Sequence, residues 1–326
     1  MRAVQVSELD GPSAVRVAEV EAPGRGDGEV LIDVAAAGVN FPDVLLTKGM
    51  YQYKPEPPFT LGSECAGTVR EAGPESRFSA GDRVVAFTMS GVFAETVSVP
   101  EQFVFPLPDE VGFPAGACLP MNYLTAHFTL ETRGGLRAGE TVLVQGAAGG
   151  IGTAVIQLAA AMGATVIGVT STEAKAEVAR RAGAAHTVGV DGFKDAVTEL
   201  TGGAGVDMVV DPVGGDRFTD SLRCLGPLGR LMVIGFTAGD IPTVKVNRLL
   251  LNNIDVRGVG WGAYALGRPD FIRSEWDALV PHLRSGALDP LISESFGLDD
   301  AATALSRIDD RTVTGKVVLL TGPESG

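Results

Sequence analysis

The stretch from residue 141 to residue 157, TVLVQGAAGGIGTAVIQ, constrains the fold of this chain more than any other. Its first four residues are apolar and mostly β-branched, which predicts a buried strand. Residues 151–162 have the apolar spacing of a helix that packs one side on a sheet. The small residues between them follow the order Ala-x-Gly-x-x-Gly from position 147 to position 152, the spacing of a dinucleotide-binding turn. Such a turn lets the backbone approach a pyrophosphate, and the helix start offers it unpaired N–H groups.

A glycine turn can also be a simple tight connection in any doubly wound sheet, so its context must decide between the two interpretations. After residue 141 the chain alternates strands and helices. We expect strands at 141–145, 165–169, 186–190, 206–211, 230–235 and 255–259. We expect helices at 151–162, 172–182, 192–201, 216–225 and 244–252. This alternation predicts an α/β fold with a Rossmann doubly wound parallel sheet, and it favours the nucleotide site.

The first 120 residues have a different pattern. Short apolar runs such as 29–34 and 82–87 are separated by Gly- and Pro-rich turns, which predicts a compact, barrel-like antiparallel domain. Strand-like runs return near the C-terminus, after an amphipathic helix expected near 269–285. We therefore expect the β-rich domain to comprise 1–122 and 266–326, the nucleotide-binding domain to comprise 123–265, and a cleft to lie between them.

The composition limits the classes of partner. The formal net charge of the 326 residues is −14, which disfavours nucleic acid and anionic membrane surfaces. The first residues, MRAVQVSELDGP, lack an apolar signal core, and no window approaches a membrane-spanning length. The three cysteines lie far apart and predict neither a disulfide framework nor a metal cluster. We expect a cytoplasmic protein that binds neither nucleic acid nor membrane.

The end of the second expected strand bears on the choice between NADPH and NADH. Proteins that select NADH usually place an acidic residue there to hold the ribose hydroxyls. Here the strand ends in Thr170 and Ser171, whose hydroxyls can bond a 2′-phosphate, and Lys175 follows one helical turn later. Ser171 or Thr172 can also be an ordinary helix cap and Lys175 a solvated charge, and both interpretations can hold at once. Glu173 lies nearby and weakens the preference for NADPH over NADH.

Six stretches along the chain together resemble one known family. They are AAGVNFPD at 36–43, LGSE at 61–64, YLTA at 123–126, GAAGGIG at 146–152, VIGF at 233–236 and TGKVVL at 314–319. In this order they resemble the zinc-independent quinone oxidoreductases of the medium-chain dehydrogenase/reductase superfamily, the zeta-crystallin-like group. The resemblance implies a GroES-like catalytic domain, a Rossmann domain, NADPH, and hydride transfer to quinones or other activated alkenes and carbonyls.

The same comparison bears on metal binding. Zinc-dependent relatives place a cysteine where this chain has Val39 and Asn40, and a Gly-His-Glu where it has Gly62-Ser63-Glu64. Zinc needs three or four ligands in a tetrahedral array, and the three histidines do not occur at such spacings. We predict that the chain binds no metal, which favours a reductase over an alcohol dehydrogenase.

The resemblance also implies the site residues. It places Asn40 and Tyr51 beside the nicotinamide, where an amide N–H and a phenolic O–H can be donated to an acceptor oxygen. A turn residue and a surface aromatic are the alternative interpretations of these two residues. Thr125 is expected on the nicotinamide side of the cofactor. The residues expected to bind the cofactor are Ala148, Gly149, Gly150, Ile151, Gly152, Thr170, Ser171, Lys175, Phe236, Thr237 and Arg311.

These expectations define a small-molecule reductase with two competing interpretations. The first is an NADPH-dependent quinone oxidoreductase, and the sequence does not separate it from an enoyl or 2-alkenal reductase that acts on α,β-unsaturated carbonyls or thioesters. An NADPH-binding protein with little turnover is an alternative from another class. In the family the last Rossmann strands pair across a two-fold axis, and the apolar stretch 249–259 can serve as such an edge. We therefore expect a homodimer.

Overall fold

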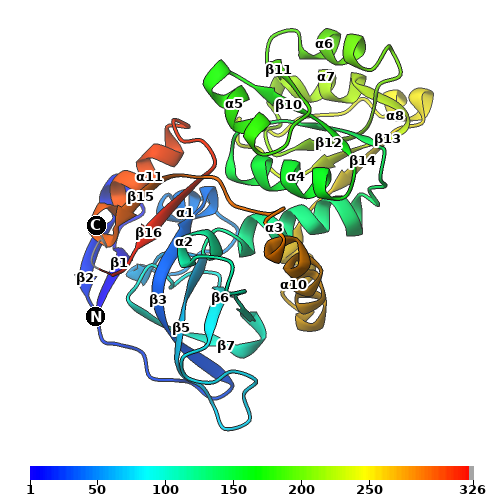
Figure 1. Cartoon of the computed structure of the whole chain (residues 1–326). Helices are drawn as coiled ribbons and strands as arrows, with labels where there is room; N and C mark the ends of the chain where they lie inside the picture. Colours follow the sequence, from blue (N-terminus) through cyan, green and yellow to red (C-terminus); the bar gives the residue numbers. More distant parts are fainter. Residues whose placement is uncertain (323–326) are drawn as a thin grey trace. The chain divides into compact units, whose positions relative to one another are not determined.

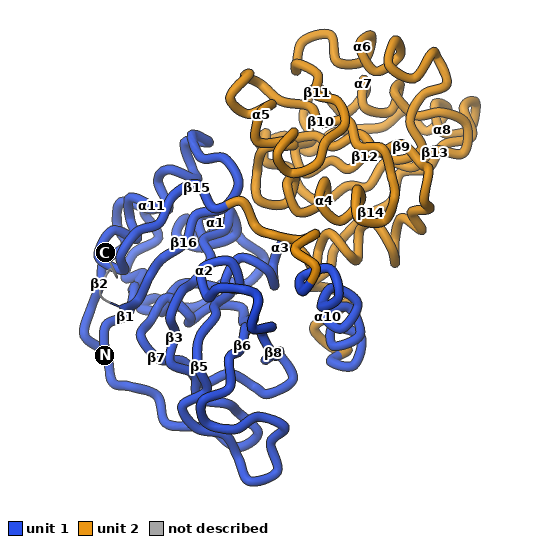
Figure 2. The backbone as a smooth tube through the Cα atoms, viewed as in Figure 1, with its two compact units in different colours: residues 1–122, 269–284, 292–326 blue, residues 123–268, 285–291 orange. Residues whose placement is uncertain are grey.

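The computed structural model describes residues 1–322, which form two compact units. Unit 1 comprises residues 1–122, 269–284 and the segment from 292 onward, and unit 2 comprises residues 123–268 and 285–291 (Figure 2). The chain therefore leaves unit 1 after Asn122 and returns to it twice. Each unit has its own sheet structure and its own hydrophobic core.

Unit 2 contains a six-stranded parallel sheet in the order β11-β10-β9-β12-β13-β14. The strands are β9 (Thr141–Val144), β10 (Thr165–Thr170), β11 (His186–Gly189), β12 (Val206–Asp211), β13 (Leu225–Val233) and β14 (Asp255–Gly258). The sequence order reverses between β9 and β12, as in a Rossmann fold, and ligands of such sheets bind outside the carboxyl ends of the strands at this point. The Rossmann doubly wound parallel sheet expected from the sequence is confirmed.

Helices connect these strands. They are α3 (Pro120–His127), which begins in unit 1 and continues as a π-helix, η3 (Phe128–Arg133), then α4 (Gly150–Ala161), α5 (Glu173–Arg181), α6 (Phe193–Leu200), η4 (Gly215–Arg217), α7 (Phe218–Arg223), α8 (Asn247–Asn252) and α9 (Trp261–Ala265). Within unit 2, α4 lies on one side of the sheet and α6 and α7 lie on the other (Figure 1). Apolar residues of both sheet faces are therefore removed from water, which explains why the strands read as near-continuous apolar runs.

Unit 1 is built on a seven-stranded sheet and a smaller three-stranded one. The larger sheet has the order β15-β16-β3-β5-β6-β8 with β7 paired to β3, and the smaller has the order β2-β1-β4. The strands are β1 (Arg2–Val6), β2 (Arg16–Glu19), β3 (Glu29–Val39), β4 (Phe59–Thr60), β5 (Glu64–Glu71), β6 (Arg83–Phe87), β7 (Thr96–Pro100), β8 (Val104–Pro106), β15 (Ile292–Gly297) and β16 (Lys316–Leu320). All pairs except β15 with β16 are antiparallel. The expected GroES-like β-rich domain is thus present.

Several helices complete unit 1. They are η1 (Pro12–Ala14), α1 (Phe41–Thr47), η2 (Glu101–Phe103), α2 (Phe113–Gly116), α10 (Pro269–Arg284), η5 (Leu298–Asp300) and α11 (Ala301–Asp309). Strand β16, at the C-terminal end of the described chain, pairs with β3 so that Val317 lies opposite Val39. This pairing brings the start of β16 next to the start of α1, although nearly the whole chain separates them in sequence (Figure 1).

The compact units divide the C-terminal part of the chain more finely than the expected domains do. Residues 266–268 group with unit 2, and so do residues 285–291. For residues 285–291 the reason is a pair of hydrogen bonds on α4: the Gln157 Nε2 atom donates to the Asp289 carbonyl at 2.6 Å, and the Asp289 N–H donates to Gln157 Oε1 at 3.0 Å. These bonds tie the segment to the Rossmann unit before the chain enters β15.

Candidate functional site

The glycine turn of unit 2 connects β9 to α4. Gly146 adopts a left-handed backbone with φ of 60°, which a residue with a Cβ adopts only with strain. Its carbonyl accepts the N–H of Gly149, the N-cap residue of α4, at 3.0 Å. The N-cap of this helix makes no side-chain hydrogen bond to it, so its first N–H groups are available to an anion. The local geometry is that of a phosphate-binding turn.

Two glycines of the turn have different neighbours. A Cβ at Gly152 would lie 2.3 Å from the Gly146 carbonyl oxygen, so only glycine allows the first turn of α4 to pack on the loop. A Cβ at Gly149 would meet the same oxygen at 3.5 Å, an ordinary contact. Glycine at position 149 is therefore not required by the contacts of unit 2 itself. A cradle that a Cβ would partly fill is what the pyrophosphate of a dinucleotide requires.

Neighbouring loops surround this turn at the carboxyl ends of the strands. The Ala147 N–H donates to Val169 of β10, and the Gln145 N–H donates to Val210 of β12. The loop after β13 lies next to the loop after β12, because the Thr237 N–H donates to the Pro212 carbonyl at 3.1 Å. The expected cofactor residues 148–152, 170, 171, 236 and 237 therefore share one edge of the sheet of unit 2.

The end of β10 shows which of its polar residues caps the next helix. The Thr172 side chain accepts the Lys175 N–H at 3.2 Å, so Thr172 is the N-cap of α5. Thr170 is buried and Ser171 is exposed, while the half-buried Lys175 occupies the first turn of α5. The carboxylate of Glu173 forms an ion pair with Arg180. The Glu173 carboxylate is thus held by a residue of its own helix, α5.

Thr125 lies in the second turn of α3, in unit 2. Its side chain is half-buried, and its carbonyl accepts the Thr129 hydroxyl at 2.6 Å. Tyr123, two residues earlier, is buried and its hydroxyl donates to Gln157 of α4. Tyr123 thus has a structural role in joining α3 to α4.

Asn40 belongs to unit 1, where it is the N-cap residue of α1 and is only 7% exposed. Its side chain takes part in four contacts. Nδ2 donates to Glu64 Oε1 at 2.8 Å and to the Gly38 carbonyl at 3.3 Å, and Oδ1 accepts from Lys316 Nζ at 2.7 Å and from Asn122 Nδ2 at 3.4 Å. The side chain is therefore part of a buried polar network and not a surface turn residue.

The centre of this network is an ion pair between Lys316, at the start of β16, and Glu64, at the start of β5. Lys316 Nζ donates to Glu64 Oε1 at 2.8 Å and to the Val39 carbonyl at 3.2 Å. The other carboxylate oxygen, Oε2, accepts the Met121 N–H at 2.8 Å. Burial is the largest single influence and would lower the pKa of the Lys316 ammonium. The charge and hydrogen bond of Glu64, together with Cys118 and Asp43, outweigh it, so the pKa is raised and the side chain stays charged.

Asp43 and Tyr51 lie around the same helix. Asp43 is completely buried; its Oδ2 atom accepts the Asn40 N–H at 2.8 Å. Burial raises the pKa of Asp43 from 3.8 to about 7, against the lowering effect of the Asn40 N–H and of Lys316. Burial and then the nearby Asp43 raise the pKa of the half-buried Tyr51 phenol, so Tyr51 remains a proton donor at neutral pH.

Arg311 belongs to unit 1, unlike the other expected cofactor residues. It follows α11, has a left-handed backbone with φ of 57°, and is exposed. Within residues 1–322, no three His, Cys, Asp or Glu side chains are grouped so that they could hold a metal ion. The three cysteines are buried thiols. In the same residues, no helix is long and apolar enough to cross a membrane.

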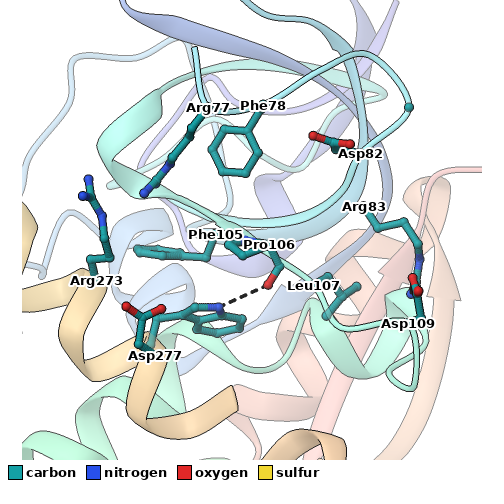
Figure 3. Close-up of a pocket in the computed structure, with 12 residues that line it drawn as sticks. Arg77, Phe78, Asp82, Arg83, Phe105, Pro106, Leu107, Asp109, Arg273 and Asp277 are labelled. Carbon is teal, nitrogen blue, oxygen red and sulfur yellow. Dashed lines mark hydrogen bonds and ion pairs between the residues drawn. The ribbon is translucent and has the colours of Figure 1, made fainter. Parts of the chain in front are cut away.

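A separate cavity of about 570 Å³ lies in unit 1, between the β6–β8 region and α10 (Figure 3). Arg77, Arg83 and Arg273 line it, but two of these guanidiniums are already bonded to backbone carbonyls: Arg77 to Val104 at 2.6 Å and Arg83 to Pro108 at 3.0 Å. Trp276 stacks on Phe105 in its wall. None of the site residues expected from the sequence lines this cavity, and Arg77 and Arg83 brace the surrounding chain.

Sequence reasoning assigned no role to Glu64, Lys316 and Asp43, although all three occur in the stretches that carried the resemblance. For Glu64 and Lys316 the signal is a charged residue at the start of an apolar strand: Glu64 precedes Cys65-Ala66, and Lys316 precedes Val317-Val318-Leu319. A buried charge at such a position needs a partner. Which partner it has depends on strand pairing and cannot be read from spacing.

Comparisons with known proteins agree with this architecture. Residues 150–284 match the family described as "Zinc-binding dehydrogenase", and residues 26–109 match the "Alcohol dehydrogenase GroES-like domain". The quinone oxidoreductase-like protein 2 of Bos taurus is 38% identical over 323 residues, covering 98% of this chain and 92% of that protein.

Two solved structures are also similar. A probable oxidoreductase from Mycobacterium abscessus is 44% identical, with a TM-score of 0.91 and coverage of 98% of this chain and 99% of that one. The Escherichia coli quinone oxidoreductase complexed with NADPH is 26% identical, with a TM-score of 0.91 and coverage of 98% and 100%. The chain belongs to the medium-chain dehydrogenase/reductase superfamily of oxidoreductases and is similar over its length to the quinone oxidoreductase-like members.

Proposed function

We propose that this protein is an NADPH-dependent reductase that transfers a hydride to quinones. The observation that carries the proposal is the composition of the sheet edge in unit 2: a glycine cradle beside a strand end that offers Thr170, Ser171 and Lys175. The similarity to a quinone oxidoreductase complexed with NADPH supports both the cofactor and the acceptor. We further propose that it acts on a small molecule in the cytoplasm, as expected from the sequence.

The residues of unit 2 would hold the cofactor, which when bound supplies the hydride. The N–H groups at the start of α4 would bind the pyrophosphate, because they are uncapped and lie at the positive end of the helix. Lys175 would neutralise the 2′-phosphate, and the Ser171 hydroxyl would donate a hydrogen bond to it. Thr125, Phe236 and Thr237 would border the nicotinamide half, and Arg311 would contact the phosphate, as the resemblance implies.

The residues of unit 1 would act on the acceptor. Asn40 would donate an amide N–H to the oxygen that gains charge when the hydride arrives, and the Tyr51 phenol would donate its O–H. Positioning of the acceptor against the nicotinamide would account for most of the rate. A protonated phenol and a fixed amide suit a carbonyl oxygen in both a quinone and an enone, so a 2-alkenal or enoyl reductase is the second candidate.

The test is the oxidation of NADPH, followed by its absorbance, with a panel of benzoquinones, naphthoquinones, 2-alkenals and a crotonyl thioester. NADH is run in parallel. We expect turnover with the quinones, and loss of most of it in the Asn40→Ala, Tyr51→Phe double variant. Faster turnover of the alkenals or the thioester would assign the protein to alkene reduction. Tight NADPH binding without any turnover would instead identify an NADPH-binding protein.

We also propose that the protein is a homodimer that forms along β14. This strand is the last in the sheet order of unit 2, so its outer edge has no strand partner within residues 1–322. Val246, Leu250 and Leu251, on and just before the neighbouring α8, are exposed apolar side chains. A sheet edge without a strand partner and exposed apolar side chains both favour association with a second copy, which can extend the sheet and remove apolar surface from water.

A further inference from the structure

The ion pair of Lys316 and Glu64 is buried to a degree that requires an explanation. Their side chains are 3% and 0% exposed. Removing two charges from water costs several kcal/mol per ion, and their attraction often repays this only in part. A pair of well-packed apolar side chains can serve the stability of a core as well or better. Stability alone therefore does not explain why this buried ion pair is present.

The hydrogen-bond partners of the pair show what it does to Asn40. An ammonium only donates and a carboxylate only accepts. Lys316 Nζ, at 2.7 Å, must therefore face the oxygen of the Asn40 amide, and Glu64 Oε1, at 2.8 Å, must face its nitrogen. The reversed amide would place donor against donor and acceptor against acceptor. The two charges thus select one of the two orientations of this side chain.

We propose that Lys316 and Glu64 are positioning residues that hold the Asn40 amide in one orientation and leave its second N–H for the oxygen of the acceptor. This inference rests on the function proposed above. The first N–H is used by Glu64, whereas the second makes only a long contact of 3.3 Å to the Gly38 carbonyl. A contact of this length is weak, so an acceptor oxygen that gains negative charge can replace it.

The pair also strengthens the donor. A cation on the carbonyl oxygen of an amide draws electron density from its nitrogen, which makes the N–H a better hydrogen-bond donor, and hydrogen bonds in such chains polarise one another. Glu64 is in turn fixed by the Met121 N–H at the start of α3. The network thereby joins the starts of four elements of the chain, namely α1, β5, α3 and β16, around a single amide.

The experiment replaces both charges at once. Lys316→Met alone would leave Glu64 as an unpaired buried carboxylate, and Glu64→Gln alone would leave an unpaired ammonium, so either single variant is expected to fold poorly. The Lys316→Met, Glu64→Gln double variant removes both charges of the pair and keeps nearly the same volume. The amide that it introduces at position 64 can accept from the Asn40 nitrogen or donate to the Asn40 oxygen. The preference for one orientation of the Asn40 amide is therefore lost, while the packing is retained.

For the double variant we expect thermal unfolding close to that of the wild type and an unchanged Kd for NADPH, because the cofactor residues named above lie chiefly in unit 2. We expect kcat with a quinone to fall by about tenfold or more, with a smaller change in KM. The reason is that the Asn40 N–H, no longer held in place, acts mainly on the charge that develops on the acceptor oxygen. A folded double variant with the kcat of the wild type would overturn the proposal.

A second measurement does not depend on turnover. The chain has five asparagines, so selective ¹⁵N labelling yields a simple spectrum of side-chain amides, in which the Asn40 signals are those missing from Asn40→Ser. A single pair of Asn40 signals with slow solvent exchange is expected in the wild type. Exchange as fast as that of the exposed Asn252 would refute the positioning role. Absence of turnover in a wild type that retains the protected amide would instead count against the proposed reductase.

Discussion

At the scale of single residues, Asp43 links the stability of unit 1 to pH. Its folded pKa of about 7 is higher than the value of 3.8 expected for an unfolded chain, because burial disfavours the carboxylate. The stability associated with the protonated form is complete below about pH 4 and is lost as the pH rises through about 7. Lys316, Glu64 and Tyr51 are the charged or titratable groups coupled to it.

We expect Asp43→Asn to remove this dependence. Relative to the variant, the free energy of unfolding of the wild type should fall by about 1.4 kcal/mol per pH unit between about pH 5 and pH 7 and level off above about pH 8. Urea denaturation at a series of pH values measures the difference. Asp270→Asn, a change at an exposed carboxylate, is the control. A constant difference between wild type and Asp43→Asn would mean that Asp43 does not titrate in this range.

The proposed selection of NADPH by Lys175 is also tested at the residue scale. Loss of a charge-assisted hydrogen bond to a phosphate costs about 1.5–3 kcal/mol. Lys175→Ala should therefore raise the Kd for NADPH by about tenfold to a hundredfold and leave that for NADH nearly unchanged. Fluorescence titration gives both constants. Lys194→Ala, on α6 and paired with Asp195, is the matched control; equal losses for both cofactors would remove Lys175 from the phosphate site.

At the scale of elements, the connection of β9 to α4 contains one glycine that we expect to be needed for folding and another that we expect to be needed for NADPH binding. Gly152→Ala forces a backbone shift, because its Cβ would lie 2.3 Å from a carbonyl oxygen, so we expect a loss of about 1–3 kcal/mol of stability. Gly149→Ala makes only an ordinary contact and has a φ of −84°, which alanine tolerates. That variant should unfold nearly as the wild type does and still bind NADPH about tenfold or more weakly, since a Cβ would enter the cradle. Normal NADPH affinity in Gly149→Ala would contradict a pyrophosphate at this turn.

The strands β9 and β12 raise another question at this scale. Val144 pairs with Val210, so Gln145 and Asp211 follow at adjacent positions on the same face of the sheet. Gln145 Oε1 and Asp211 Oδ2 are both buried without a hydrogen-bond partner among the described residues. Burial raises the pKa of Asp211, even though the Gly214 and Val213 N–H groups oppose the shift. A proton on Asp211 Oδ2 would turn this oxygen into a donor, and we expect Gln145 Oε1 to be its acceptor.

We expect Asp211→Asn to stabilise unit 2, because the new amide can donate to Gln145 Oε1 while its oxygen keeps the two N–H groups. The gain should be about 1–3 kcal/mol at about pH 8 and smaller at acid pH, where Asp211 itself is protonated. Denaturant unfolding at two pH values measures it. Asp207→Asn, in the same strand, controls for the charge, and destabilisation by Asp211→Asn at both pH values would exclude the shared proton.

At the scale of the whole molecule, the edge strand β14 predicts the assembly. Sedimentation velocity should give a species of twice 33.7 kDa for the wild type. A Leu250→Glu, Leu251→Glu variant should sediment as a monomer, because two charges would be buried at the contact. Leu9→Glu, at an exposed position of unit 1, should remain dimeric. A wild type that sediments at 33.7 kDa at micromolar concentration would exclude the proposed dimer.

The sequence determined much of this protein through local patterns. The alternation of strands and helices after residue 141, and the spacing of Gly149 and Gly152, define the Rossmann sheet and its glycine turn, because periodicity and turn chemistry act over short distances. Apolar runs with Gly- and Pro-rich turns likewise define the β-rich unit. The sequence also predicted a helix cap after β10, and Thr172 was one of its two candidates for the cap of α5.

Only the tertiary structure decided which distant residues meet. Lys316 reaches Asn40 because β16 pairs with β3, a contact across 276 residues of chain. Gln157 links residues 285–291 to unit 2 through two hydrogen bonds to Asp289, which the spacing of residues in the sequence does not predict. Local patterns specify elements, whereas the pairing of strands and the need of buried polar groups for partners specify which elements touch. For this reason the glycine turn could be found from sequence, and the network that holds Asn40 could not.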